Sequence, residues 1–235
     1  MITTFILFNF AVILSEATTV QYNWTIHYAK YNPDGVYHVV IAIDDDDGIF
    51  NFLGPTIRAC KNNIIQVIVH NNLPNESTSI HWHGIHQLNI PWMDGVSHIT
   101  QYPIMPMQSF HYTFVASSVG THWFHSHIGT QYADGLFGVL IVEDLEDPYE
   151  GLPEFLLTMT EWWHRYAIDQ FDILTTHPTN HHHGCAVFLS GIMNGKDRYD
   201  CSLIEQPLLM LNITGEEQNQ LDDNLICASH RPYGC

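Results

Sequence analysis

Basic residues are scarce in this sequence: seven lysines and arginines stand against 25 aspartates and glutamates, and the formal net charge is −18 at pH 7. Such an acidic excess disfavours nucleic-acid binding and docking on anionic membranes, because both need clustered positive charge. Long apolar runs are also missing, whereas a membrane-spanning helix needs about 20 apolar residues. We therefore expect no nucleic-acid partner and no membrane span.

The apolar run at residues 5–14 is too short to cross a bilayer, and Ser15-Glu16-Ala17 follows it with small residues at the positions that signal peptidase reads. This pattern favours a cleaved secretory signal peptide over residues 1–17 rather than a buried strand, and so a secreted protein. Three acceptor triplets for N-glycosylation agree with secretion, at Asn23, Asn75 and Asn212.

Cysteine is limited to five residues, and no two of them form a Cys-x-x-Cys pair: Cys60, Cys185, Cys201, Cys227 and Cys235. This spacing disfavours a redox dithiol and a structural zinc knuckle. An odd number of cysteines in a secreted chain leaves one thiol unpaired or bound to a partner outside the sequence.

A convincing helical period is absent too, and short strands separated by glycine, proline and asparagine take its place. Residues 36–43, 64–69 and 138–142 are rich in β-branched residues, and Phe110, Tyr112 and Phe114 alternate with polar neighbours. This alternation places His111 on the polar face of its strand. The pattern predicts an all-β fold, an antiparallel β-sandwich.

Two His-x-His pairs stand out among these strands: His81-Trp82-His83 and His125-Ser126-His127. Alternate side chains of a strand point to the same face, so each pair presents two imidazoles side by side. A single pair of this kind is usually structural, but two pairs within one domain-sized stretch indicate a site for copper or zinc. We expect the two pairs to converge at one end or edge of the sandwich.

The longer segments around these pairs resemble the two N-terminal copper signatures of the multicopper oxidases, the laccase and ferroxidase family. The first segment covers residues 81–104, the second covers residues 120–142, and a third similarity begins with Gly54-Pro-Thr-Ile-Arg-Ala-Cys60. The resemblance implies a cupredoxin-like Greek-key β-sandwich over residues 18–148. It also implies that residues 149–235 are the start of a second, incomplete cupredoxin domain, with a strand resuming at residues 155–159.

Carried over residue by residue, the resemblance implies copper as cofactor and four metal ligands. His81 resembles the ligand of the type 2 copper, whereas His83, His125 and His127 resemble ligands of the coupled type 3 pair. Asp94 matches an acid that assists proton delivery near this cluster; its alternative role is that of a turn residue before Gly95. The implied partners are dioxygen and a small reducing substrate, either a diphenol or a metal ion.

Other family motifs are missing from the sequence, which contains neither His-Cys-His nor His-Pro-x-His-x-His. The chain therefore supplies half of the trinuclear ligands and no type 1 copper site, and we expect a fragment that is inactive without a C-terminal cupredoxin domain. Two alternatives remain open: a copper-binding module without turnover, and a zinc-dependent hydrolase or lyase. The tract His181-His182-His183 is expected to bind metal only adventitiously, and residues 205–235 are expected to pack poorly.

Overall fold

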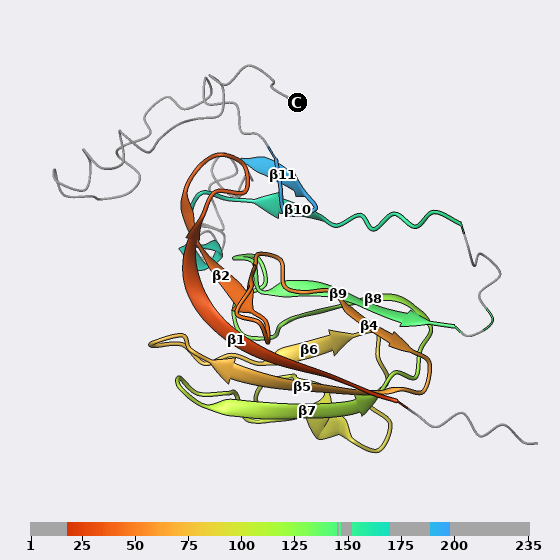
Figure 1. The fold of residues 1–235 in the computed structure, drawn as a ribbon. Coiled ribbons are helices and arrows are strands. Elements are labelled where there is room, and N and C mark those ends of the chain that lie inside the picture. The colour runs from red at the N-terminus through yellow and green to blue at the C-terminus, as the bar shows by residue number, and fades with distance from the viewer. Residues whose placement is uncertain (1–17, 145, 147–151, 170–188, 198–235) are drawn as a thin grey trace, which may run out of the picture.

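The computed structural model describes residues 18–144, 146, 152–169 and 189–197, and within them the chain is almost entirely β (Figure 1). Several predictions concern residues outside these ranges: the signal peptide at 1–17, the tract at 181–183, Asn212 and the packing of residues 205–235. None of the described helical residues forms a helix long and apolar enough to cross a membrane.

Two sheets face each other. The first has the strand order β3-β2-β1-β5-β7, and its strands are β1 (Thr19–Tyr31), β2 (His38–Asp44), β3 (Phe50–Asn51), β5 (Ile64–Asn71) and β7 (Ser109–Val115). The second has the order β4-β9-β8-β6, with β4 (Ile57–Cys60), β6 (Ile80–His83), β8 (Gly120–Ser126) and β9 (Phe137–Glu143). A short 3-10 helix, η1 (Pro91–Met93), lies between β6 and β7.

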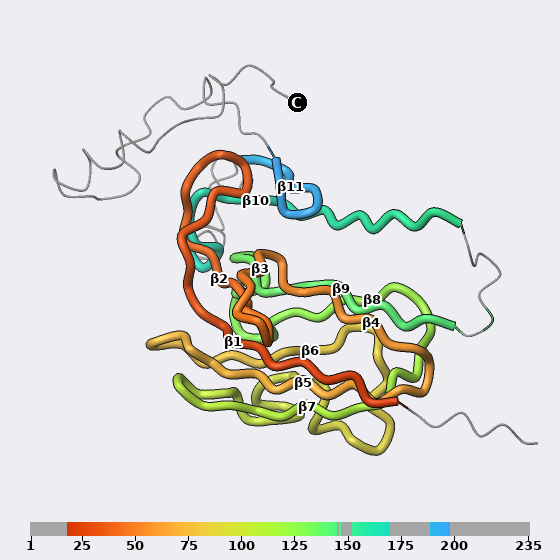
Figure 2. The backbone as a smooth tube through the Cα atoms, viewed as in Figure 1, coloured from red at the N-terminus to blue at the C-terminus, as the bar shows by residue number. Residues whose placement is uncertain are grey.

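The sandwich is mixed rather than purely antiparallel, which corrects the prediction. Strand β1 pairs in parallel with β5, and β4 pairs in parallel with β9, while the other pairs are antiparallel. Strand β1 is long enough to serve two neighbours: Thr19–Ile26 pairs with β5, and Thr25–Tyr31 pairs with β2 (Figure 2). The alternation of apolar residues does not distinguish parallel from antiparallel neighbours, so the sequence alone did not reveal this pairing.

The core is formed by the inward faces of both sheets. Burial alternates along β5, and Tyr112 and Phe114 of β7 point inward as the sequence predicted, while His111 is exposed. Large aromatic rings join the two sheets: the Trp24 and Phe124 rings lie 4.6 Å apart, and the Trp82 and Phe114 rings 4.8 Å apart. This packing fixes the alternate residues of β6 and β8 on the opposite face.

A small antiparallel sheet of two strands, β10 (Met159–Trp162) and β11 (Ser190–Met193), covers the outer face of β2 (Figure 1). Trp162 and Ile192 bury against Val40 and Ala42. The predicted strand at residues 155–159 is wrong in its position. Strand β11 ends at Met193, before a turn in which Asn194 has a φ of +49°. Because Met159 pairs with Met193, β10 has no partner before Met159 and begins there.

Candidate metal centre

The two histidine pairs lie on neighbouring strands of the second sheet. Strands β6 and β8 are antiparallel, and their register places His81 opposite His125. Trp82, which separates His81 from His83, and Phe124, which directly precedes His125, are fully buried in the core. The histidines therefore face away from the core, on the same side of the sheet, as the predicted convergence requires.

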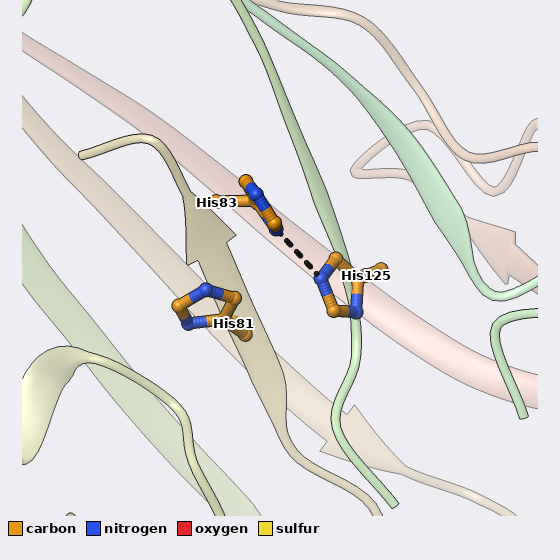
Figure 3. A group of neighbouring side chains, drawn as sticks. All are labelled: His81, His83 and His125. Atoms are coloured by element: carbon orange, nitrogen blue, oxygen red, sulfur yellow. Dashed lines mark hydrogen bonds between the residues drawn. The ribbon is translucent and has the colours of Figure 1, made fainter. Parts of the chain in front are cut away.

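Three of the four predicted ligands form a tight group. The ligand nitrogens of His81, His83 and His125 all lie within 4.8 Å of one another. Figure 3 shows these rings, and the dashed line joins the Nδ1 atom of His83 to the Nε2 atom of His125, which are 3.3 Å apart. His127 follows directly after β8, and its ring lies 5.6 Å from that of His81 and 6.0 Å from that of His125. Its ring is about as far from these two as the three rings of the group are from one another, but His127 is not among the residues whose nitrogens lie within 4.8 Å.

Backbone hydrogen bonds orient two of these rings. The Nδ1 atom of His81 donates to the carbonyl oxygen of Asp94 at 2.7 Å, and the Nδ1 atom of His125 donates to the carbonyl oxygen of Ser126 at 2.8 Å. Because a carbonyl oxygen can only accept, each Nδ1 carries the hydrogen, and in the neutral ring Nε2 is then the nitrogen with the lone pair. Such contacts to the second ring nitrogen are typical of metal-binding histidines.

Electrostatics keep His125 neutral. The pKa of His125 is lowered to about 4, mainly by burial and in part by the neighbouring His81, His83 and His127, while the hydrogen bond to Ser126 opposes the shift. Neutral imidazole is the form that binds a metal ion, so the ring is ready for coordination at neutral pH.

Asp94 contacts His81 more closely through its backbone carbonyl oxygen than through its carboxylate. Its carboxylate Oδ1 lies 3.4 Å from the Nδ1 atom of His81, whereas its carbonyl oxygen makes the shorter contact described above. The next residue, Gly95, has a φ of +81°, and a Cβ atom there would fall 1.8 Å from the carbonyl oxygen of Ile80. Only glycine fits this turn, which places Asp94 against His81.

Trp123 is a site residue that the sequence reasoning missed. Its ring stacks on His125, with centroids 4.2 Å apart, and on His83, with centroids 5.1 Å apart. It lies two residues before His125 on the same face of β8 and opposite His83 in the register. The stacked Trp123 ring restricts the rotation of the His83 and His125 rings. The signal for it in the sequence was a tryptophan two residues before a His-x-His pair.

The donor set suits a transition metal. The tight group offers imidazole nitrogens only, which favour copper, zinc, iron or nickel over magnesium and calcium, since the latter two prefer oxygen ligands. Three such nitrogens fit either a copper ligand set or a three-histidine zinc site. Geometry alone therefore leaves copper and zinc as candidates.

Comparison with known proteins distinguishes them. A family model described as multicopper oxidase matches residues 21–147. The chain is 36% identical to an L-ascorbate oxidase of Cucumis sativus over 222 residues, which cover 91% of this chain and 36% of that protein. It is 38% identical to an iron transport multicopper oxidase of Gibberella zeae over 164 residues, or 67% of this chain and 26% of that protein.

Solved structures agree with the sequence relatives. The crystal structure of Fet3p, a multicopper oxidase that functions in iron import, superposes with a TM-score of 0.68 and 33% identity, covering 76% of this chain and 33% of that one. A laccase from Botrytis aclada gives a TM-score of 0.66 and 31% identity, covering 81% and 33%. The fold is thus the all-β cupredoxin type, and the chain spans about a third of the length of the curated relatives it matches. The match of the family model to residues 21–147 shows that the chain belongs to the multicopper oxidases, whose cofactor is copper.

Proposed function

We propose that His81, His83, His125 and His127 bind copper, and that the chain is the copper-binding portion of a laccase-like oxidase. The observation that carries this proposal is the convergence of three imidazole nitrogens within 4.8 Å on two paired strands. In the assignment that the family resemblance suggests, His81 serves the type 2 copper and the other three serve the type 3 pair.

Bound copper would supply one-electron redox chemistry, by which a small reducing substrate is oxidised and dioxygen is reduced to water. The residues of this chain orient and protect that site. The Asp94 carbonyl oxygen and the Ser126 carbonyl oxygen hold the rings of His81 and His125 with their Nε2 atoms free. The Asp94 carboxylate, 3.4 Å from the Nδ1 atom of His81, is positioned to hold a proton at the edge of the site.

Turnover requires more than this chain carries in its sequence. No His-Cys-His segment and no His-Pro-x-His-x-His segment occurs in the 235 residues. A substrate electron then has no type 1 copper to enter through, and half of the cluster ligands have no counterpart. We propose that a C-terminal cupredoxin domain completes the cluster, and that the 235-residue chain alone binds copper without sustained oxidation of diphenols or ferrous iron.

The resemblance to the multicopper oxidases also suggests how the chain is divided into domains and where the protein is located. We propose residues 18–148 as the first cupredoxin domain, residues 149–235 as the beginning of a second, and residues 1–17 as a signal peptide of a secreted protein. Two glycosylation triplets within the described residues support secretion, because Asn23 and Asn75 are both exposed.

A copper titration of the purified chain tests the proposal directly. Competition with a chelator of known affinity should show tight copper binding that exceeds zinc binding, following the general order of divalent-metal affinities. An oxygen electrode should show no sustained uptake with a diphenol, ascorbate or ferrous iron. Preferential zinc loading with hydrolytic activity would favour the zinc alternative, and sustained oxygen uptake would contradict the proposed lack of turnover.

A further inference from the structure

A buried glutamine, Gln131, lies behind the two histidine strands. Only 4% of its surface is exposed, and its side-chain amide makes four hydrogen bonds. A primary amide has two donors and an acceptor oxygen with two lone pairs, so every hydrogen-bonding position of this side chain is used. Buried polar groups that are fully satisfied in this way fix the local structure strongly.

The amide oxygen connects the segments that carry the two histidine pairs. Oε1 accepts a hydrogen bond from the Ser126 hydroxyl at 2.7 Å and another from the Thr78 hydroxyl at 2.9 Å. Ser126 lies between His125 and His127, and Thr78 lies three residues before His81. A single oxygen atom therefore joins the end of β8 to the approach to β6.

The amide nitrogen fixes which way the side chain points. Nε2 donates to the Glu76 carboxylate at 3.0 Å and to the carbonyl oxygen of Ser77 at 3.0 Å. Both partners can only accept, so the nitrogen must face them and the oxygen must face the hydroxyls. Glu76 is itself held, because its other carboxylate oxygen accepts a hydrogen bond from the Tyr28 hydroxyl of β1 at 2.6 Å.

One direct side-chain contact also joins the two segments, because the Thr78 and Ser126 hydroxyl oxygens lie 3.5 Å apart, but each hydroxyl donates its hydrogen to Gln131. Thr78 and Ser79 are fully buried, and Ser126 is 2% exposed, so solvent does not replace a lost partner. The backbone adds the β6–β8 ladder, which pairs Ile80 with Ser126, and a hydrogen bond from the amide of His127 to the carbonyl oxygen of Ser79 at 3.1 Å. The ladder sets the register of the two histidine pairs, and the Gln131 amide holds the end of β8, which His127 follows, against the approach to β6.

We propose that Gln131 is a positioning residue for the copper site: it locks the end of β8 against the approach to β6, so that His125 and His127 meet His81 and His83 at the separation copper needs. The inference rests on the copper site proposed above. The four hydrogen bonds of the Gln131 side chain reach none of the four histidine rings, so it acts through Ser126 and Thr78.

A substitution of Gln131 in the full chain tests the proposal. In Gln131→Glu the carboxylate faces Glu76 and the Ser77 carbonyl oxygen without a hydrogen to donate to either. Copper affinity, measured by chelator competition, should fall about 10- to 100-fold, the usual effect of altering the groups that orient metal ligands. The Cu(II) EPR spectrum at saturating copper should change as well, which a loss of stability alone would not cause.

Two variants serve as controls. Glu76→Gln leaves an oxygen for Gln131 and a polar group for Tyr28, so copper binding should stay close to that of the unmodified chain. Gln66→Glu introduces the same chemical change on the half-buried outward face of β5 and should have no effect. The double variant Glu76→Gln/Gln131→Glu restores a donor between the two side chains, and we expect it to bind copper more tightly than Gln131→Glu.

The outcomes separate this proposal from the proposed function. If the unmodified chain binds no copper, the proposed function is wrong and this inference falls with it. If the chain binds copper and Gln131→Glu binds it equally well with an unchanged spectrum, or the double variant binds no more tightly than Gln131→Glu, only the inference is overturned. Should Gln131→Glu fail to fold, Gln131→Met, neutral and of similar size, takes its place with the same expected loss, and unchanged copper binding would overturn the proposal.

Discussion

The Nδ1 atom of His83 lies 3.3 Å from the Nε2 atom of His125, although 42 residues separate them in the sequence. Two nitrogen ligands about 2.0–2.1 Å from one tetrahedral metal ion are about 3.3 Å apart, so the two rings already stand at the spacing of ligands that share a metal. The fold reaches this arrangement through strand register and core packing.

Replacing either ring should therefore remove most of the copper binding. We expect His83→Ala and His125→Ala to lower copper affinity by more than about 100-fold, because even changes in the groups that orient ligands cost about 10- to 100-fold. His111→Ala is the matched control, since His111 is exposed on β7, on the outward face of the first sheet. His182→Ala should also leave binding nearly unchanged. A titration in which His182→Ala abolishes binding while His83→Ala does not would move the site to the histidine tract.

The turn at Asp94 and Gly95 gives a second prediction. Gly95→Ala should lower both thermal stability and copper affinity, because its Cβ atom would meet the Ile80 carbonyl oxygen and displace the Asp94 carbonyl oxygen from His81. Asp94→Asn keeps that carbonyl oxygen. Its effect on copper affinity should be no more than about fivefold, since the Nδ1 hydrogen of His81 is already bound to the backbone carbonyl oxygen and the carboxylate lies farther away, at 3.4 Å. Equal losses in the two variants would show that the carboxylate, rather than the backbone, orients His81.

The buried His38 gives a prediction about stability and pH. The pKa of His38 is lowered to about 4, mainly by burial and in part by nearby His164, while Asp34 opposes the shift. An unfolded histidine has a pKa of about 6.5, so the unfolded chain takes up a proton first. This stability is fully present above pH 6.5 and is lost as the pH falls toward 4.

His38→Phe tests this assignment. Phenylalanine keeps a ring against Trp162 and Tyr166, and the Nε2 atom that it removes has no hydrogen-bond partner among the described residues. The decrease in the free energy of unfolding between pH 7 and pH 4 should shrink by on the order of 3 kcal/mol. Urea unfolding at the two pH values measures it. The assignment fails if His38→Phe keeps the full pH dependence of the unmodified chain.

Much of the site could be predicted from the sequence, because its geometry follows from local rules. The His-x-His spacing places two rings on one face of a strand, and the buried Trp82 between the first two shows which face is the core. The all-β class followed from the alternation of Phe110, Tyr112 and Phe114. These features depend only on neighbours in sequence, which a single chain displays.

Features that depend on distant pairing were not predictable. The parallel pairing of β1 with β5 produces the same alternation as an antiparallel pair. Gln131 stands among threonine, tyrosine and glycine in a turn, a composition typical of a surface loop, and its burial becomes visible only when Ser126, Thr78 and Glu76 surround it. Boundaries also shifted, as at Met159, because the partner strand sets the length of the ladder.

The last prediction concerns Asp134, an acid that is 6% exposed and close to two other acids. The pKa of Asp134 is raised to about 7, mainly by burial and in part by repulsion from Glu76 and Asp169, while a hydrogen bond from the Ala167 amide opposes the shift. Because the folded chain holds this proton more tightly than the unfolded chain, stability contributed by the protonated acid is present below about pH 4. It is lost as the pH rises from there to 7.

Asp134→Asn should remove this loss. Asparagine stays neutral and can still accept the Ala167 amide through its Oδ1 atom, as Asp134 does at 2.9 Å. At pH 8 the variant should be more stable than the unmodified chain by roughly 2–4 kcal/mol, and the difference should become small near pH 4. Chemical unfolding at both pH values measures it. Asp169→Asn, which removes one repelling charge from an exposed position, should give a smaller gain at pH 8. The free energy of unfolding depends on pH only where the folded and unfolded chains bind a different number of protons. If the difference between Asp134→Asn and the unmodified chain were the same at both pH values, the folded-state pKa of this carboxyl group would not be raised.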